Sequence, residues 1–334
     1  MIKVIFSCGD VNGIGPEIAV KVFSKIFKSQ KTNHIIYITP FNVFNYYYKK
    51  LKADFKFSII DSIKSSKSNL LNIIKIADTK LSVGKITSSA GKASYLSLQQ
   101  GVDLIIKNEA DILVTPPLSK ESVNKAGIKF IGHTEYLANR ELKDEYLMTF
   151  VSDNLIASLV TIHEPIKNVS GLLSKEKLKK VILLFHKTLE QDLGVKNPRI
   201  AVLGLNPHAG ENGLIGKEES EIIIPVIKSF NDHYNISGPF VPDAFWGNQL
   251  YKKFDAVLGM YHDQILIPFK MLNFNSGVNY TAGLKMIRTS PDHGTAFDIA
   301  GKNIASPSSL YQAYKVGLNI YHNRKKYFAS SKSK

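Results

Sequence analysis

Short apolar runs alternate with longer segments of helical period along most of the chain. Seven runs have the length and the β-branched content of strands: Lys3–Ser7, His34–Thr39, Asp111–Thr115, Leu147–Val151, Ala157–Ile162, Arg199–Leu205 and Ala256–Met260. A helical period is found between them, in Glu17–Phe27, Ala90–Lys107, Lys175–Glu190 and Glu218–Phe230. Because parallel strands need crossover connections, this alternation predicts an α/β protein with a largely parallel sheet.

Length and composition narrow the class of protein. A chain of 334 residues is long enough for two domains, or for one large unit with a cleft. Its 44% hydrophobic and 21% charged residues are typical of soluble globular proteins. No apolar stretch approaches the ~18–20 residues of a membrane helix, and the N-terminus lacks the features of a signal peptide. With Cys8 as its single cysteine, the chain is expected in the cytoplasm, without a membrane partner.

The net charge of +15 raises the question of an anionic partner. Most of the basic residues are lysines spread along the chain, and arginine occurs at four positions: Arg140, Arg199, Arg288 and Arg324. Surfaces that recognise nucleic acids favour arginine, with aromatic residues interleaved. The sequence therefore predicts no nucleic-acid partner. A small anionic substrate fits the charge better, and Arg288 lies in a segment that is dense in motif-like residues.

Three histidines, His163, His208 and His262, each follow an apolar run almost immediately. In an open α/β sheet, ligands bind beyond the carboxyl ends of the strands. Three imidazoles at that edge could hold one divalent ion and leave a coordination position open for a substrate. Each histidine could equally be a loop or helix-capping residue, since the wide spacings carry no local metal signature. Position alone leaves both interpretations open.

A glycine-rich turn, Gly9–Glu17, connects the first predicted strand to the first predicted helix. Its glycines allow close backbone approach, Pro16 suits the first helical position, and a helix N-terminus favours an anionic group. The pattern is not G-x-G-x-x-G, so the standard dinucleotide fingerprint is absent. A plain strand-to-helix turn is the alternative.

A second unusual segment, Arg288–Lys302, concentrates glycine, histidine, aspartate and threonine. Backbone amides and hydroxyls in such a loop could surround a nucleotide, and Arg288 could bind a phosphate or carboxylate. We favour a binding site here over a merely structural loop.

Together these segments resemble the 4-hydroxythreonine-4-phosphate dehydrogenase family of vitamin B6 biosynthesis. The resemblance extends from Gly9 to about Ile320, with the motifs in the same order. It is carried by the Gly13–Glu17 turn, Ala126-Gly127-Ile128, Gly132-His133-Thr134-Glu135, Thr161-Ile162-His163, Gly204–Glu211, Tyr261-His262-Asp263-Gln264 and the Arg288–Gly301 loop.

The resemblance implies a two-domain α/β/α fold similar to isopropylmalate and isocitrate dehydrogenases, with the active site in an interdomain cleft. The expected outer domain comprises residues 1–128 plus 266–334 and carries the nucleotide-adjacent loop. The expected central domain, residues 129–265, carries the metal histidines and the dimer interface. The resemblance further implies a homodimer whose subunits share the active site.

Individual residues match positions of this family. The implied metal ligands are His163, His208 and His262. The implied substrate-binding residues are His133, Thr134, Lys270, Asn279 and Arg288, with Asp243 and Lys120 as candidate catalytic residues. The implied cofactor-adjacent residues are Gly13, His293, Gly294, Thr295, Asp298 and Gly301. The cofactors implied are NAD, or NADP, and one divalent metal, for which zinc, cobalt, magnesium and manganese stay open.

The implied reaction oxidises 4-phosphooxy-L-threonine with NAD and then releases CO₂, giving 3-amino-2-oxopropyl phosphate for pyridoxal 5'-phosphate synthesis. The alternative is a sister enzyme that acts on a phosphorylated sugar acid such as threonate 4-phosphate. The chain departs from common family forms at three positions: Asn12 replaces a usual alanine, Pro116 a frequent glycine, and Ser119 a frequent histidine. None of these positions is among the implied metal ligands or substrate anchors.

Overall fold

The computed structural model describes residues 1–28, 33–230 and 234–331, and the chain divides into two compact units. Unit 1 comprises Met1–Asp144 and Leu284–Tyr321, and unit 2 comprises Glu145–Gly283 and His322–Lys334. These borders lie beyond the 128/129 and 265/266 borders expected from the sequence. Among the described residues, no helix is both long enough and apolar enough to cross a membrane.

Local contacts explain where unit 1 ends. Helix α5 (His133–Glu141) stays in unit 1 because Arg140 pairs with Asp103, and the Glu141 carboxylate accepts hydrogen bonds from the backbone N–H groups of Lys285 and Met286. No glycine- or proline-rich linker marks this border in the sequence. The expected border therefore rested on the family resemblance alone.

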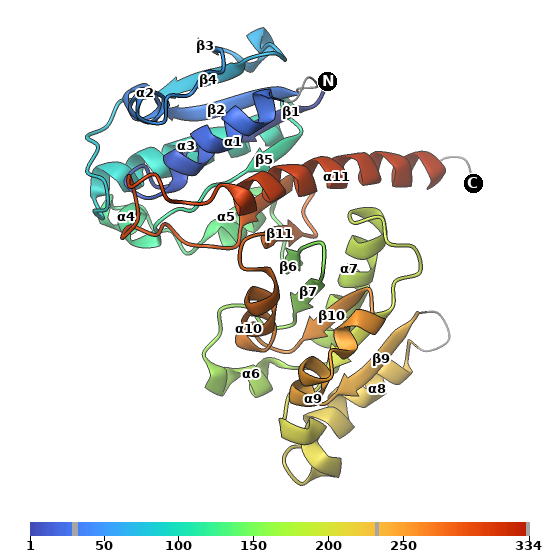
Figure 1. Cartoon of the computed structure of the whole chain (residues 1–334). Coiled ribbons are helices and arrows are strands. Elements are labelled where there is room, and N and C mark those ends of the chain that lie inside the picture. Colours follow the sequence, from blue (N-terminus) through green and yellow to red (C-terminus); the bar gives the residue numbers. More distant parts are fainter. Residues whose placement is uncertain (29–32, 231–233, 332–334) are drawn as a thin grey trace. The chain divides into compact units, whose positions relative to one another are not determined.

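Unit 1 is built on a run of parallel strands (Figure 1). Their order is β3-β4-β2-β1-β5-β12, and each neighbouring pair is parallel. The strands are β1 (Lys3–Phe6), β2 (His34–Pro40), β3 (Phe57–Ile59), β4 (Leu71–Ile76), β5 (Ile112–Val114) and β12 (Ile287–Pro291). Arg288 therefore lies on a buried strand and not in a loop, because its neighbours Ile287 and Thr289 are core positions of β12.

Helices cover both faces of these strands. They are α1 (Gly15–Phe27), α2 (Phe41–Lys50), α3 (Ser88–Ile106), α4 (Lys120–Lys125), α5 and α11 (Ser308–Ser331), with a short 3₁₀ turn η1 (Ile63–Ser65). On one face, the Phe6 ring packs 5.1 Å from Phe23 of α1 and 6.0 Å from Tyr314 of α11. On the other face, Ile5 packs against Gly101 of α3. Successive residues of β1 thus point to opposite faces, which makes β1 a fully buried central strand.

Unit 2 has the strand order β11-β6-β7-β10-β8-β9. Strand β6 is antiparallel to both of its neighbours, β11 and β7, whereas β7, β10, β8 and β9 run parallel to one another. The strands are β6 (Leu147–Val151), β7 (Ile156–Leu159), β8 (Ile200–Leu203), β9 (Ile236–Phe240), β10 (Ala256–Gly259) and β11 (Val278–Ala282). All seven strands predicted from the sequence are present, and the α/β class is confirmed.

Short helices connect the strands of unit 2. They are α6 (Ile166–Leu172), α7 (Lys175–Gln191), η2 (Pro207–Gly213), the π-helical η3 (Glu219–Ile223), α8 (Ile224–Lys228), α9 (Pro242–Gly247), η4 (Leu250–Lys253) and α10 (His262–Asn273). Helix α10 packs on β7 and β10, and Figure 1 shows these three elements together. Its residues Ile265, Leu266 and Phe269 belong to the apolar core of unit 2, so α10 stays with this unit.

A buried ion pair stabilises unit 2 away from the histidines. The Asp192 carboxylate accepts hydrogen bonds from the Tyr280 hydroxyl at 2.6 Å and from Nε of Arg324 at 2.7 Å. Asp192 and Arg324 are both largely buried, so neither charge is well solvated. Removing one partner of such a pair leaves the other charge uncompensated.

We therefore expect Asp192→Asn to lower the free energy of unfolding by about 3–5 kcal/mol, measured by urea denaturation. Asp255→Asn is the matched control, because Asp255 pairs with the mostly exposed Arg199 at the surface. That variant should lose about 1 kcal/mol or less. Equal losses in the two variants would contradict the stabilising role of the buried pair.

Candidate functional site

The three predicted ligand histidines follow three adjacent strands of unit 2. His163 follows β7, His262 follows β10 and His208 follows β8, and β10 lies between the other two. The parallel register pairs Gly259 with Leu159, and Leu258 with Val202, so the three strands end at nearly the same level. All three histidines therefore emerge at one edge, the carboxyl edge where α/β sheets bind ligands.

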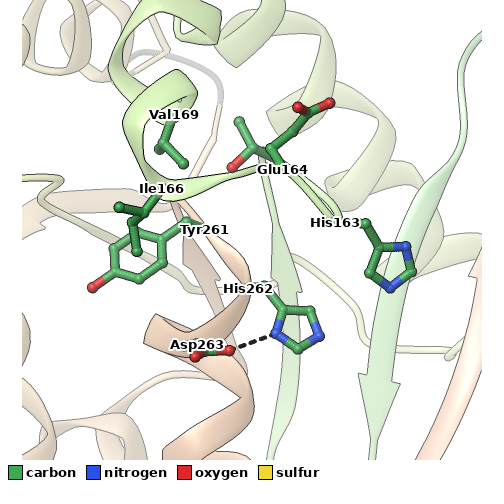
Figure 2. A pocket seen from close by; sticks show the side chains of 8 residues that line it. His163, Glu164, Ile166, Val169, Tyr261, His262 and Asp263 are labelled. Carbon is green, nitrogen blue, oxygen red and sulfur yellow. Dashed lines mark hydrogen bonds and ion pairs between the residues drawn. The ribbon is translucent and has the colours of Figure 1, made fainter.

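Two of these histidines lie close together. The ring centroids of His163 and His262 are 5.7 Å apart, and both rings border an open hollow of about 210 Å³. Figure 2 shows the two rings neighbouring each other, with Tyr261, Glu164 and Asp263 around the same hollow. His163 has a positive φ of 41°, a conformation that costs energy for a residue other than glycine. Such strain is often found where a side chain must be aimed at a ligand.

The Asp263 carboxylate orients the His262 ring. Its Oδ1 lies 2.7 Å from Nδ1 of His262, and Figure 2 marks this contact. When Nδ1 carries the proton donated to Asp263, Nε2 keeps its lone pair and can bind a metal ion. A carboxylate behind a histidine is the usual arrangement for a ligating imidazole.

The spacing of these two rings is close to what a shared ion requires. With zinc–nitrogen bonds of about 2.0–2.1 Å and a tetrahedral angle, the centroids of two ligating imidazoles lie roughly 5 Å apart. The observed separation of the two centroids is 5.7 Å. However, within the described residues of this single chain, no three histidine, cysteine or acidic side chains are grouped so that they could hold an ion. His208 does not line the hollow.

Hydrogen bonds tie the three histidine-bearing loops to one another. The Thr161 hydroxyl donates to the Met260 carbonyl at 2.7 Å and joins the loop after β7 to the end of β10. The buried Gln264 amide joins β10 to β8: its oxygen accepts from the Met260 N–H, and its nitrogen donates to the Gly204 carbonyl. The sequence interpretation did not assign Gln264 this role, although the residue lies in one of the motifs.

The loop that carries His208 has an unusual backbone. Five consecutive residues, His208 to Asn212, have positive φ angles, and only Gly210 among them is a glycine. Left-handed conformations cost roughly 1–2 kcal/mol for each non-glycine residue, so neighbouring groups must hold this turn in place. The buried Glu219 carboxylate does so by accepting hydrogen bonds from the backbone N–H groups of Leu205 and Asn206. Sequence reasoning missed Glu219, since nothing in its segment distinguishes a buried acid from an exposed one.

A second group of predicted residues gathers in unit 1. His133 begins α5, Thr134 is buried beside it, and Arg288 on β12 is almost fully buried, with its Nε donating to the Thr115 hydroxyl at 2.8 Å. Burial lowers the pKa of Arg288 to about 9, with Glu135 acting in the opposite direction, so the guanidinium is charged at neutral pH. Lys120 lies near Gly132 and adds a second positive charge. The excess of positive charge suits an anion such as a phosphate.

The surroundings of His133 change the pKa of its ring. Burial, and the positive charges of Arg288 and Lys120, lower its pKa well below the usual 6.5. The ring is therefore neutral at physiological pH and can donate one hydrogen bond and accept another.

The predicted cofactor-adjacent residues also lie in unit 1. Ile14 donates its N–H to the carbonyl of Thr295, and a side chain at Gly13 would meet that carbonyl oxygen at 2.8 Å. The Asn12 side chain holds a third segment, because its Oδ1 accepts from the N–H of Ser82. The Gly9–Glu17 turn thus packs directly against the Thr295 loop. The remaining residues of this loop are His293, whose Nδ1 lies 3.1 Å from the Gly294 carbonyl, the exposed Asp298, and Gly301 with a φ of 71°.

The other predicted substrate-contacting residues lie in unit 2. Lys270 is exposed on α10, and Asn279 lies on β11 with a buried Oδ1 that lacks a hydrogen-bond partner. Asp243 is exposed in the first turn of α9, a helix that contacts the His208 turn. Lys270 and Asp243 thus remain candidates for substrate binding because they are exposed. Asn279 remains a candidate because its buried Oδ1 lacks a hydrogen-bond partner.

Comparison with known proteins identifies relatives along nearly the whole chain. The family model described as pyridoxal phosphate biosynthetic protein PdxA matches residues 31–317. A 4-hydroxythreonine-4-phosphate dehydrogenase of Bacteroides thetaiotaomicron is 40% identical over 97% of this chain and 90% of its own length. The enzyme of that name from Sulfurihydrogenibium sp. is 38% identical over 97% of this chain and 100% of its own length.

Solved structures of known proteins are also similar to this chain. A crystal structure of 4-hydroxythreonine-4-phosphate dehydrogenase from Klebsiella pneumoniae is 31% identical, covers 96% of this chain and 100% of its own, and superposes with a TM-score of 0.81. A terephthalate 1,2-cis-dihydrodiol dehydrogenase from Burkholderia xenovorans, 24% identical with a TM-score of 0.63, covers 95% of this chain and 98% of its own and shares the fold.

The charge state of His133 gives a direct test of the unit 1 group. We expect its ring ¹⁵N shifts to remain those of a neutral imidazole from about pH 8 to about pH 6, with His133→Asn identifying the signal. Because the unfolded chain protonates this histidine first, its contribution to stability is complete above about pH 6.5 and decreases as the pH falls towards the folded pKa. A midpoint near 6.5 would show that the ring is solvated and distant from Arg288.

Proposed function

Because the chain belongs to the family of the pyridoxal phosphate biosynthetic protein PdxA, we propose that it is a 4-hydroxythreonine-4-phosphate dehydrogenase. It oxidises 4-phosphooxy-L-threonine with NAD, or NADP, and releases CO₂ to form 3-amino-2-oxopropyl phosphate for pyridoxal 5'-phosphate. The observation that carries this proposal is the pair of histidines at the carboxyl edge of β7 and β10, in a chain whose relatives bear this name.

The histidines hold one divalent ion. Such an ion, when bound, acts as a Lewis acid on the hydroxyl and carboxylate oxygens of the substrate. His262, whose Nδ1 is engaged by Asp263, presents Nε2, and His163 lies beside it. Neutral imidazoles suit this task, since they bind the ion without cancelling its charge. Zinc or cobalt fits the nitrogen ligands, and magnesium or manganese fits the substrate oxygens.

The unit 1 residues bind the anionic end of the substrate. Arg288 is held by Thr115 and offers a planar guanidinium, which suits a forked contact with a phosphate. Lys120 adds a second positive charge, and the neutral His133 adds a hydrogen bond without requiring a proton to be taken up. Thr134 contributes a hydroxyl beside them. By the family resemblance, Lys270 and Asn279 contact further polar groups of the substrate, and Asp243 orients its amine.

The nicotinamide cofactor binds along the Thr295 loop. Gly13, Gly294 and Gly301 allow the backbone to approach the cofactor closely, and no Rossmann motif is needed. The close packing of the Gly9–Glu17 turn on this loop supports a preformed surface.

The buried free thiol of Cys8 agrees with a cytoplasmic location, where thiols stay reduced.

A second copy of the chain completes the metal site. Each element that follows a ligand histidine exposes large apolar side chains, as expected of a surface that another protein covers. Ile166 is 73% exposed after His163, Leu214 is 84% exposed after His208, and Met271 and Phe274 are 82% and 80% exposed on and after α10. Within the part of the chain that the structure describes, no three ligands are grouped, and we infer that the homodimer supplies the missing one across this surface.

Mixing two inactive variants tests the shared site. His208→Ala and His262→Ala should each abolish NADH formation when assayed alone. If ligands come from both subunits, an exchanged equimolar mixture contains hybrid dimers with one intact site, and we expect about a quarter of the wild-type activity. A mixture that stays inactive after verified subunit exchange would place His208 and His262 of one site in the same chain and contradict this arrangement.

Substrate choice is tested by steady-state NADH formation. We expect kcat/KM for 4-phosphooxy-L-threonine to exceed that for threonate 4-phosphate by at least about tenfold, a preference worth about 1.4 kcal/mol, since the sugar acid has no ammonium group to pair with the Asp243 carboxylate. Asp243→Asn should reduce this preference, and Asp153→Asn is the control, because Asp153 is exposed in the turn that precedes β7, at the strand end opposite to His163. Turnover of the sugar acid alone would replace the proposed substrate with the alternative.

A further inference from the structure

The His208 turn depends on a buried acid for its conformation. Residues His208 to Asn212 are left-handed without interruption, which free loops of non-glycine residues do not adopt. The Glu219 carboxylate packs against this turn, because its Oε2 would lie 2.6 Å from a Cβ atom placed on Gly210.

Glu219 uses both of its carboxylate oxygens. Oε1 accepts the N–H groups of Leu205 at 2.7 Å and Asn206 at 2.8 Å, and Oε2 accepts from the Asn206 side chain at 2.9 Å. The residue is 2% exposed and lies at the start of the π-helix η3, a rare conformation often found at functional sites. One buried carboxylate thus fixes the chain immediately before His208.

Gln264 connects this fixed chain to the other histidines. Its amide nitrogen donates to the Gly204 carbonyl at 2.7 Å, at the base of the His208 loop, and its oxygen accepts from the Met260 N–H at 2.6 Å, just before His262. Glu219 and Gln264 together therefore link the base of the His208 loop to the end of the strand that carries His262.

We propose that Glu219 and Gln264 are positioning residues that preset His208 for metal binding, a role that rests on the proposed metal site. Neither side chain touches the ion. Their hydrogen bonds fix the base of the loop, and Glu219 packs against Gly210, so that the left-handed turn is set before the ion arrives and binding does not have to order it. Loss of either group should weaken ion binding even where the fold persists.

The sharpest variant is Glu219→Gln, which keeps the size of the side chain. A glutamine keeps one oxygen acceptor but replaces the other carboxylate oxygen with an N–H₂ group, which cannot accept a hydrogen bond. That N–H₂ group would face N–H donors that Glu219 now accepts from Leu205 or Asn206. Glu221→Gln is the matched control, because Glu221 lies on the same π-helix, makes the same charge change and is exposed. The dissociation constant for Co²⁺ is measured on the full chain by competition with a chromophoric chelator, alongside the Co²⁺ absorption spectrum and the melting temperature of the metal-free protein.

We expect Glu219→Gln to weaken Co²⁺ binding by about 10–100-fold and to alter the Co²⁺ spectrum, while Glu221→Gln matches the wild type. An unchanged affinity in Glu219→Gln, with or without a lower melting temperature, overturns the positioning role. If Glu219→Gln does not fold, Gln264→Glu decides, since it sets a carboxylate against the Gly204 carbonyl and should also weaken binding. A wild-type protein that binds no Co²⁺ would instead overturn the metal site itself.

Discussion

The parallel hydrogen-bonded register of β7, β10 and β8 is the constraint on which the proposed chemistry depends. It brings the ends of three strands that are distant in sequence to one level, so that the loops carrying His163, His262 and His208 leave the sheet at a common edge. A shift of one residue in any of these strands would reverse its buried face and turn its loop away. The apolar core below this edge, including Phe150 and Phe269, therefore stabilises the site as well as the fold.

Polar side chains form hydrogen bonds with the backbone just beyond the ends of these strands. Thr161, Gln264 and Glu219 saturate backbone groups at the strand ends, where the sheet can no longer pair them. In unit 1, the charged Arg288 is buried beside His133, whose pKa is lowered so that the ring is neutral. The excess of positive charge there favours an anion. Unit 2 thus carries the proposed metal ligands, and unit 1 carries a group of side chains suited to an anion.

The sequence predicted the seven strands because their apolar runs are long and bounded by polar turns, and these runs also indicated where the histidines emerge. It did not predict β12, since Arg288-Thr289-Ser290 reads as polar although the strand is buried. The sequence did not predict the left-handed turn after Pro207, because four of the six residues with positive φ are not glycines and tertiary contacts impose the conformation. Glu219 was missed for the same reason: its partners lie in the backbone of another segment, which no local pattern records. The unit borders are not marked by a glycine- or proline-rich linker, so the expected borders rested on the family resemblance.

The metal site is tested most directly by anomalous X-ray diffraction from crystals of the protein grown with Co²⁺ or Zn²⁺. The account predicts one strong anomalous peak per subunit, about 2.0–2.2 Å from Nε2 of His262 and from a nitrogen of His163, with a third imidazole in contact. That third ligand should come from the second subunit. An anomalous peak bound by other residues, or none between His163 and His262, would contradict the account.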